Sequence, residues 1–156
     1  MAQQLWLLRH GEAVPHDSAA DDADRELTER GRDQSRAAGR ALSALEVEVH
    51  LCFTSPKVRA RQTAELACAE LDVEPVDESS LADGFDGRAA LDLMAAAGAD
   101  QRVLVVGHEP DFSQVVHDLT GGRVGFKKGG LAGVRLDGSR GELMVLLRPR
   151  ETDRIR

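Results

Sequence analysis

Basic side chains that could bind an anion follow three short apolar runs of the chain. They are Arg9 and His10 after residues 5–8, Arg59 after residues 50–54, and His108 after residues 102–106. Arginine presents a planar fork of N–H donors that matches the oxygens of a phosphate. Two arginines and two histidines in one pocket would form an oxyanion site, for which phosphate is the natural occupant.

The elements that must bring these residues together alternate between strand and helix. Apolar runs predict strands at 5–8, 50–54, 74–77 and 102–106, and helical patterns cover 28–45, 55–71, 88–97 and 111–119. Thr28 and Ser55 are the expected N-caps, with Pro56 at the first helical position. Ligands bind at the carboxyl edge of open α/β sheets. Parallel strands would therefore deliver all four basic residues to one crevice.

The remaining segments complete a single domain. Loops are expected at 16–24, 78–87 and 121–130, and two apolar runs around Asp137-Gly138 predict a β-hairpin. We predict one three-layer α/β domain over residues 1–150, with a mostly parallel central sheet flanked by helices. A charged tail at 151–156 should follow, with fraying expected from Pro149 onward.

Composition narrows the possible partners. The chain has 156 residues and a formal net charge of -7, which argues against nucleic acid or an anionic membrane as its main partner. No apolar run approaches the roughly 20 residues of a membrane span. No signal peptide is recognisable, and Cys52 and Cys68 are expected to be buried, reduced thiols. We therefore expect a cytoplasmic protein.

Four motifs, in order along nearly the whole chain, resemble those of the histidine phosphatase (phosphoglycerate mutase-like) superfamily. They are residues 8–12 (LRHGE), 25–31 (RELTERG), 54–64 (TSPKVRARQTA) and 106–110 (VGHEP). The length and the compact C-terminal half are most similar to the short branch of this superfamily, the SixA-type phosphohistidine phosphatases.

The resemblance implies a role for each matched residue. His10 would attack phosphorus through a neutral imidazole nitrogen, and water would then hydrolyse the resulting phosphohistidine. Arg9, Arg59 and His108 would neutralise the charge of the transferring phosphoryl group, and Arg25 would be an outer phosphate ligand. The resemblance implies no cofactor, and no residue spacing indicates a metal site.

A general acid would complete the site, and the sequence offers two candidates for it. Many members of the superfamily protonate the leaving oxygen with a carboxylic acid that follows a Leu in the loop after the second motif. Asp83 falls at that position here, and Glu78 is a weaker candidate, whereas the resemblance to the SixA-type proteins implies that the acid is absent. An imidazole leaving group, with a reference pKa near ~6.5, needs less help from an acid than an alkoxide does.

Three functions are compatible with these residues. The leading interpretation is a metal-independent phosphatase that acts on a phosphohistidine of a protein. The alternatives are a phosphatase of small phosphomonoesters and a non-catalytic module that binds phosphate or a phosphopeptide. Lys127 and Lys128 are either a solvated pair or contacts for an acidic or phosphorylated protein, and four further basic residues are expected to be surface or structural: His16, His50, Arg61 and His117.

Overall fold

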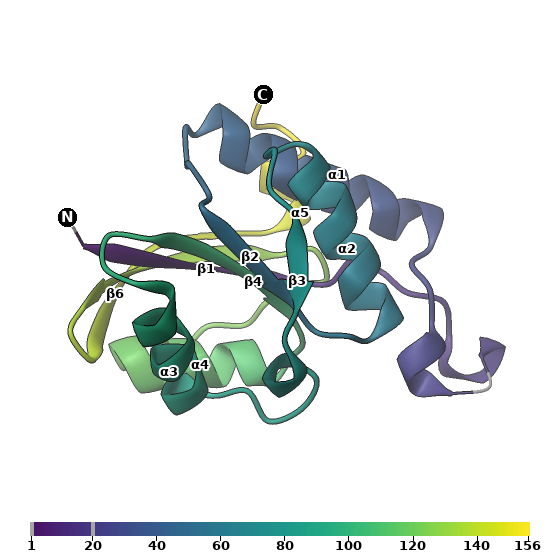
Figure 1. Cartoon of the computed structure of the whole chain (residues 1–156). Coiled ribbons are helices and arrows are strands. Elements are labelled where there is room, and N and C mark those ends of the chain that lie inside the picture. Colours follow the sequence, from purple (N-terminus) through teal and green to yellow (C-terminus); the bar gives the residue numbers. More distant parts are fainter. Residues whose placement is uncertain (1, 20) are drawn as a thin grey trace.

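The computed structural model describes residues 2–19 and 21–156 and contains a six-stranded sheet. The sheet order is β3-β2-β4-β1-β5-β6 (Figure 1). The strands are β1 (Gln3–Arg9), β2 (Leu51–Thr54), β3 (Pro75–Asp77), β4 (Arg102–Gly107), β5 (Leu131–Asp137) and β6 (Arg140–Leu147). The first four run parallel, and β5 and β6 form an antiparallel hairpin at one edge.

Helices cover both faces of this sheet, as Figure 1 shows. On one face lie α1 (Glu29–Ala44) and α2 (Val58–Ala69), with the short helix α5 (Pro149–Thr152) beside α1. On the other face lie α3 (Gly87–Ala97) and α4 (Asp111–Thr120). The predicted fold class, one α/β domain with a mostly parallel sheet between helical layers, is confirmed.

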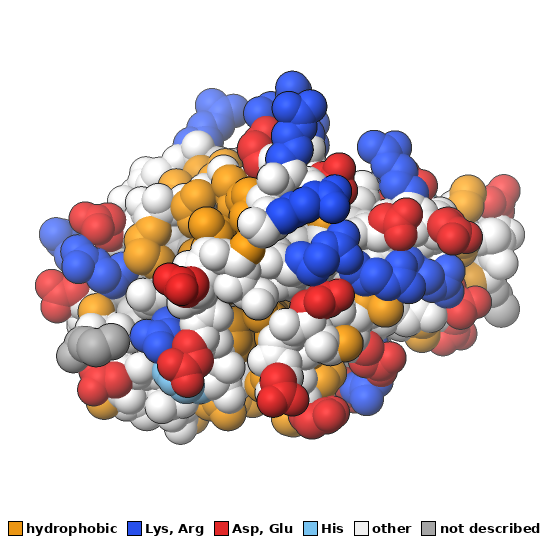
Figure 2. All heavy atoms as spheres, turned by 90° about the horizontal axis from the view of Figure 1, so that it is seen from above, with side chains coloured by type: hydrophobic (Ala, Val, Ile, Leu, Met, Phe, Trp, Pro, Cys, Tyr) orange, Lys and Arg blue, Asp and Glu red, His pale blue; other side chains and the backbone are white. Residues whose placement is uncertain are grey.

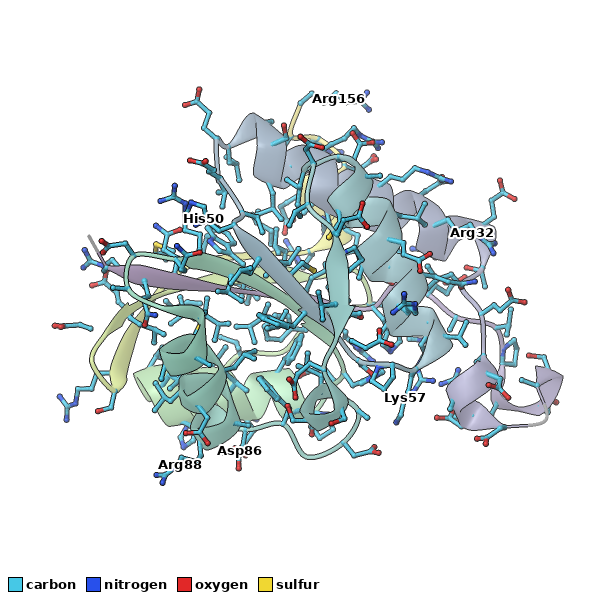
Figure 3. All side chains as sticks on the ribbon, viewed as in Figure 1. Arg32, His50, Lys57, Asp86, Arg88 and Arg156 are labelled. Carbon is cyan, nitrogen blue, oxygen red and sulfur yellow. The ribbon has the colours of Figure 1, made fainter. Side chains whose placement is uncertain are left out.

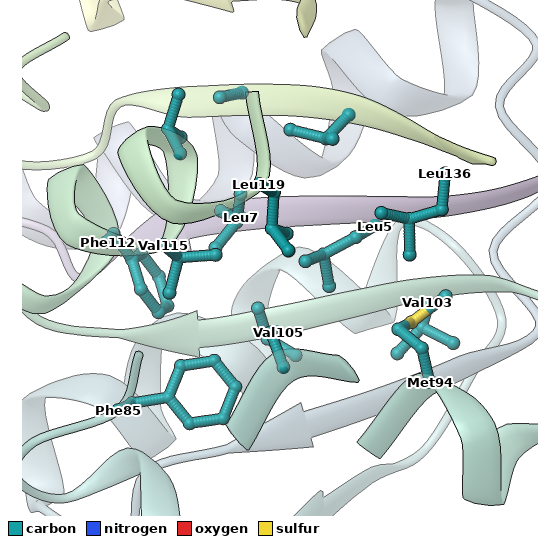
Figure 4. Packing of buried hydrophobic residues seen from close by; sticks show 14 of the residues in the cluster. Leu5, Leu7, Phe85, Met94, Val103, Val105, Phe112, Val115, Leu119 and Leu136 are labelled. Carbon is teal, nitrogen blue, oxygen red and sulfur yellow. The ribbon is translucent and has the colours of Figure 1, made fainter. Parts of the chain in front are cut away.

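Each face of the sheet has its own apolar core. Figure 4 shows the core under α3 and α4, in which Phe112 and Val115 of α4 pack against Leu7 of β1. The second core lies under α1 and α2 and is built largely from small side chains, such as Ala38, Ala60 and Ala64. Small residues allow close helix approach: a Cβ on Gly39 of α1 would stand 2.5 Å from a backbone oxygen of α2. Both cores fix the helices that follow β1, β2 and β4.

Of the two predicted N-caps, one is confirmed and the other is wrong. Thr28 caps α1 as expected, because its Oγ1 accepts the Gly31 N–H at 3.0 Å. The predicted N-cap at Ser55 is wrong, since α2 begins only at Val58 after an extended Lys57. The hydroxyl of Ser55 is instead used by a histidine, as described below.

The expected fraying from Pro149 onward is also wrong. Residues Pro149–Thr152 form α5, and Thr152 is buried. The turn is stabilised because Glu151 Oε1 accepts the Arg148 backbone N–H at 2.9 Å, with proline at the first helical position. The prediction of fraying relied on the charged composition of residues 149–156, which does not indicate this cap.

The surface above α1, α2 and α5 carries many Lys and Arg side chains beside an apolar area (Figure 2). Among the residues that the structure describes, no helix is both long enough and apolar enough to cross a membrane.

Candidate active site

A cleft of about 780 Å³ opens at the carboxyl edge of the parallel strands. The six predicted site residues that line it come from five separate segments of the chain. The lining includes Arg9, His10, Arg25, Arg59, Asp83 and His108. The structure thus brings together every residue that the sequence singled out for the site, except the weaker acid candidate Glu78, which does not line the cleft.

The register between β1 and β4 places the two histidines side by side. Arg9 pairs with Gly107 across the parallel ladder, and the His10 N–H donates to the Gly107 carbonyl at 3.0 Å. His10 and His108, each the next residue beyond its strand, have ring centroids 5.3 Å apart. Arg59, in the first turn of α2, is buried beside them.

The orientation of the His10 ring follows from one hydrogen bond. Its Nδ1 lies 2.7 Å from the carbonyl oxygen of Gly11. Because a carbonyl only accepts, Nδ1 must carry the proton. The lone pair is then on Nε2, the nitrogen that a nucleophilic imidazole would use.

Burial keeps this imidazole neutral. It lowers the pKa of His10 to about 3, against a smaller opposing effect of the Gly11 carbonyl, and the neighbouring His108, Arg59 and Arg9 side chains lower it further. Burial, followed by the charges of Arg59 and Lys57, lowers the pKa of His108 to about 4. At neutral pH both rings are therefore uncharged, and His10 is available as a nucleophile.

Ser55 is the hydrogen-bond partner of the His108 ring. The Ser55 Oγ accepts the Lys57 backbone N–H at 3.2 Å and lies 2.8 Å from His108 Nε2. The Ser55 hydroxyl accepts this one bond and can donate its own proton to Nε2 of the neutral ring. In that arrangement the ring proton of His108 lies on Nδ1, as a donor suited to an anionic oxygen.

Three buried side-chain nitrogens in this cleft have no hydrogen-bond partner among the described residues. They are Nε of Arg9, Nε of Arg59 and Nδ1 of His108. A buried unsatisfied polar group costs about 1–3 kcal/mol, and such groups are rare in folded proteins. Every such atom among residues 2–19 and 21–156 belongs to a residue of the predicted oxyanion site, and the three residues line one cleft.

The donors are held by fixed contacts. Arg9 Nη1 donates to the Phe126 carbonyl at 2.7 Å. Arg59 Nη1 and Nη2 donate to the backbone carbonyl and the carboxylate of Asp22 at 2.9 and 3.2 Å. Arg25 Nε also donates to Asp22, at 2.9 Å. Arg25 therefore lines the cleft and shares the Asp22 carboxylate with Arg59.

Comparison with known proteins decides the family. The family model of the histidine phosphatase superfamily (branch 1) matches residues 5–88. The chain is 32% identical to an uncharacterized protein of Picosynechococcus sp., over 94% of this chain and 97% of that one. It is 30% identical to the phosphohistidine phosphatase SixA of Escherichia coli, over 87% of each chain. The chain belongs to the histidine phosphatase superfamily.

A solved structure supports the same placement. The protein histidine phosphatase SixA complexed with tungstate superimposes with a TM-score of 0.86 and 29% identity, covering 95% of this chain and 98% of that chain. The chain is accordingly a hydrolase of the phosphatase class with the fold of SixA.

In this histidine phosphatase the candidate acid Asp83 is poorly placed for proton transfer. Its side chain is 85% exposed, and it accepts a hydrogen bond from Lys57 Nζ at 3.0 Å. Figure 3 shows Lys57 at the N-terminal end of α2. The Glu78 carboxylate accepts hydrogen bonds from the backbone N–H and the hydroxyl of Ser80 in the same turn. The carboxylate of Asp83 is thus paired with Lys57 at the wall of the cleft, and that of Glu78 is bonded within its own turn.

Sequence reasoning missed several residues of this histidine phosphatase. His16 and Asp22 lie in the predicted surface loop, with side chains 80% and 43% exposed, and they also line the cleft, with His16 Nδ1 3.0 Å from Asp22 Oδ1. Thr63 joins the two halves of the site, because its Oγ1 accepts the Gly11 N–H and donates to the Arg59 carbonyl. Thr63 could have been found from the sequence, because it lies four residues after Arg59 on the same helix face. The loop residues Asp22 and His16 show no comparable pattern.

No metal site is evident in the described ranges: no three His, Cys, Asp or Glu side chains there are grouped to hold an ion.

Proposed function

We propose that this phosphatase removes the phosphoryl group from a phosphohistidine of a protein, with His10 as the nucleophile. The observation that carries the proposal is the set of three unpaired buried donors, Arg9 Nε, Arg59 Nε and His108 Nδ1, around a neutral His10. Donors fixed where negative charge gathers are usually the largest contribution to such catalysis. The names of the SixA relatives support the substrate class, and tungstate is a tetrahedral oxyanion like phosphate.

In the first step Nε2 of His10 attacks phosphorus, and the P–N bond of the substrate breaks. When the other nitrogen of the substrate ring is protonated, that ring leaves as neutral imidazole and needs no proton at the leaving atom. The Nδ1 proton of His10 stays on Nδ1 and is donated in a hydrogen bond to the Gly11 carbonyl, 2.7 Å away. The phosphorylated His10 ring is therefore itself a good leaving group when water attacks phosphorus in the second step.

The state of the carboxylates favours phosphohistidine over a phosphoester. An alkoxide leaving group needs a proton in the transition state, and Asp83 is exposed and paired with Lys57. Glu109, also at the cleft, accepts hydrogen bonds from the Ser113 N–H at 2.8 Å and the Phe126 N–H at 3.1 Å. We infer that no carboxylic acid serves the reaction, and that the guanidinium groups supply the positive charge without a metal ion.

The test compares substrates and variants in one assay. Wild type, His10→Ala and Asp83→Asn are incubated with a phosphohistidine protein and with a panel of phosphomonoesters, with and without EDTA. We expect EDTA-resistant phosphate release from phosphohistidine, unchanged in Asp83→Asn and abolished in His10→Ala, and little release from esters. Undiminished hydrolysis by His10→Ala would refute the nucleophile. Ester hydrolysis that depends on Asp83 would favour the small-molecule alternative.

We also propose a cytoplasmic location. Cys52 and Cys68 are free and buried, and unpaired thiols fit a reducing compartment. Cell fractionation with an antibody to the native protein tests this proposal.

A further inference from the structure

A second groove, of about 440 Å³, opens beside the phosphoryl cleft and carries an excess of positive charge. Its charged lining consists of one acidic residue, Glu12, and six cationic ones: Arg9, Arg30, Lys127, Lys128, Arg148 and Arg150. The whole chain, by contrast, has a net charge of -7. This basic groove is therefore a local exception on an acidic protein, and its charge is not explained by the phosphoryl chemistry.

The basic groove is continuous with the catalytic cleft. Arg9, Glu12 and Lys128 line both hollows. The single acid, Glu12, is already engaged, because Oε1 accepts the Thr28 hydroxyl at 3.0 Å and Oε2 lies 3.6 Å from Arg30 Nη1. A ligand that extends from the cleft into the basic groove would contact mainly Lys and Arg side chains.

The two lysines project from a turn that is tied to the catalytic strand. The Gly129 N–H donates to the carbonyls of Arg9 and His10 at 3.1 and 3.0 Å, and the Arg9 N–H donates to the Gly130 carbonyl at 2.9 Å. Gly129 has a φ of 81°, and a Cβ there would stand 2.9 Å from the Gln34 Cβ. The turn is therefore fixed relative to His10, so little ordering is needed when a partner binds.

The lysine charges are also available. Lys127 and Lys128 are exposed, and neither forms an ion pair or a side-chain hydrogen bond with any residue that the structure describes. Lys57, in contrast, is held by Asp83. Arg148 and Arg150 share one carboxylate, that of Glu151, so the groove keeps an excess of positive charge.

We propose that the basic groove docks carboxylate side chains that flank the phosphohistidine on the surface of the substrate protein. This inference rests on the proposed function and specifies its partner: an acidic protein surface. The cleft alone accommodates the phosphorylated side chain, whereas the groove extends beyond it to where neighbouring residues of a protein substrate would lie. Complementary charge there would speed encounter and fix the register of the substrate.

The experiment uses three peptides of equal length, each with one phosphohistidine flanked by Glu, by Gln or by Lys. We expect the wild type to hydrolyse the Glu peptide with a kcat/KM about three- to tenfold above that of the Gln peptide, the gain of two or so surface ion pairs. The Lys peptide should be slower than both. About 0.5 M NaCl should remove the differences, because it screens exposed charges.

The variant Lys127→Ala/Arg150→Ala removes two charges that line the groove and not the cleft. It should lose the preference for Glu through a higher KM, while its activity on free phosphohistidine stays at the wild-type level. The control Arg88→Ala/Arg140→Ala removes two exposed charges elsewhere and should keep the preference. Equal kcat/KM on the Glu and Gln peptides, or stronger inhibition by a duplex oligonucleotide than by polyglutamate, would overturn the docking proposal. Failure to hydrolyse any phosphohistidine would instead overturn the proposed function.

Discussion

The carboxylate of Asp22 lies 3.2 Å from Nη2 of Arg59, and the backbone carbonyl of Asp22 accepts Arg59 Nη1 at 2.9 Å. Asp22 belongs to a short turn between β1 and α1, so this loop is clamped onto the oxyanion site. Burial raises the pKa of Asp22, but Arg59 and Arg25 lower it by more, so the carboxylate is ionised at neutral pH. A phosphoryl group bound in the cleft would therefore share the Arg59 guanidinium with the Asp22 carboxylate.

Asp22→Asn should strengthen the binding of the product phosphate. The substitution retains the backbone bond to Arg59 and removes one negative charge beside the site. We expect the inhibition constant of inorganic phosphate to fall about fivefold, equivalent to about 1 kcal/mol. Asp24→Asn, in the same turn but exposed, is the control. An inhibition constant that rises in Asp22→Asn would mean that the carboxylate chiefly holds Arg59 in place.

The pH dependence of turnover should reveal the neutral nucleophile. Because the pKa of His10 is lowered to about 3, this ring stays unprotonated as the pH falls from 6.5 to 5. A substrate imidazole near its reference pKa of about 6.5 gains its proton over the same range and leaves more easily. We expect kcat/KM on a phosphohistidine peptide to rise or stay level from pH 7 to pH 5. A tenfold loss per pH unit below 6.5 would show a nucleophile with an ordinary pKa.

The same histidines should make stability depend on pH. Their pKa values are about 3 and about 4 in the folded protein and about 6.5 in the unfolded chain. Between these values the unfolded chain binds protons that the folded protein does not. The free energy of unfolding should therefore fall as pH falls from about 6.5 to about 4, by up to about 1.4 kcal/mol per pH unit for each histidine.

Urea unfolding at pH 7, 6 and 5 measures this slope. His10→Asn should reduce it, since asparagine can still donate to the Gly11 carbonyl but does not titrate. His117→Asn, at an exposed position on α4, should leave it unchanged. Equal slopes in all three proteins would contradict the lowered pKa of His10.

Ser55→Ala should impair catalysis through His108. Without the hydroxyl, Nε2 of His108 loses its partner at 2.8 Å, and the proton is free to move from Nδ1 to Nε2. We expect kcat to fall about tenfold, near the loss of one charge-assisted hydrogen bond in the transition state. The ¹⁵N chemical shifts of the His108 ring report the tautomer directly. A lower kcat with Nδ1 still protonated would assign Ser55 a merely structural role.

The elements that carry the chemistry were predictable from sequence, whereas the contacts between them were not. Apolar runs located β1, β2 and β4, and the position of a residue beyond a parallel strand placed His10 and His108 at one edge. Asp22 could not be found this way, because its loop has no apolar period and its contact with Arg59 spans 37 residues of sequence. The prediction of Ser55 as an N-cap was wrong for a related reason. Its hydroxyl is hydrogen-bonded to the buried His108, which is distant in sequence, and local patterns do not indicate such a contact.

Thr63→Val tests whether the two halves of the site are joined by one hydroxyl. Thr63 is fully buried; its Oγ1 accepts the Gly11 N–H at 3.1 Å and donates to the Arg59 carbonyl at 2.8 Å. Valine has nearly the same shape, so the change leaves the Gly11 N–H unsatisfied with little loss of packing. We expect about 1–3 kcal/mol of destabilisation in urea unfolding, and a lower kcat because Gly11 also holds the His10 ring.

Ser35→Ala is the matched control, since Ser35 is buried and its hydroxyl donates to the Gly31 carbonyl within α1. This variant removes a buried hydroxyl from the neighbouring helix and should leave kcat unchanged. If Thr63→Val loses stability but keeps full activity, the Gly11 carbonyl holds His10 without help from α2, and the coupling between the two halves is absent.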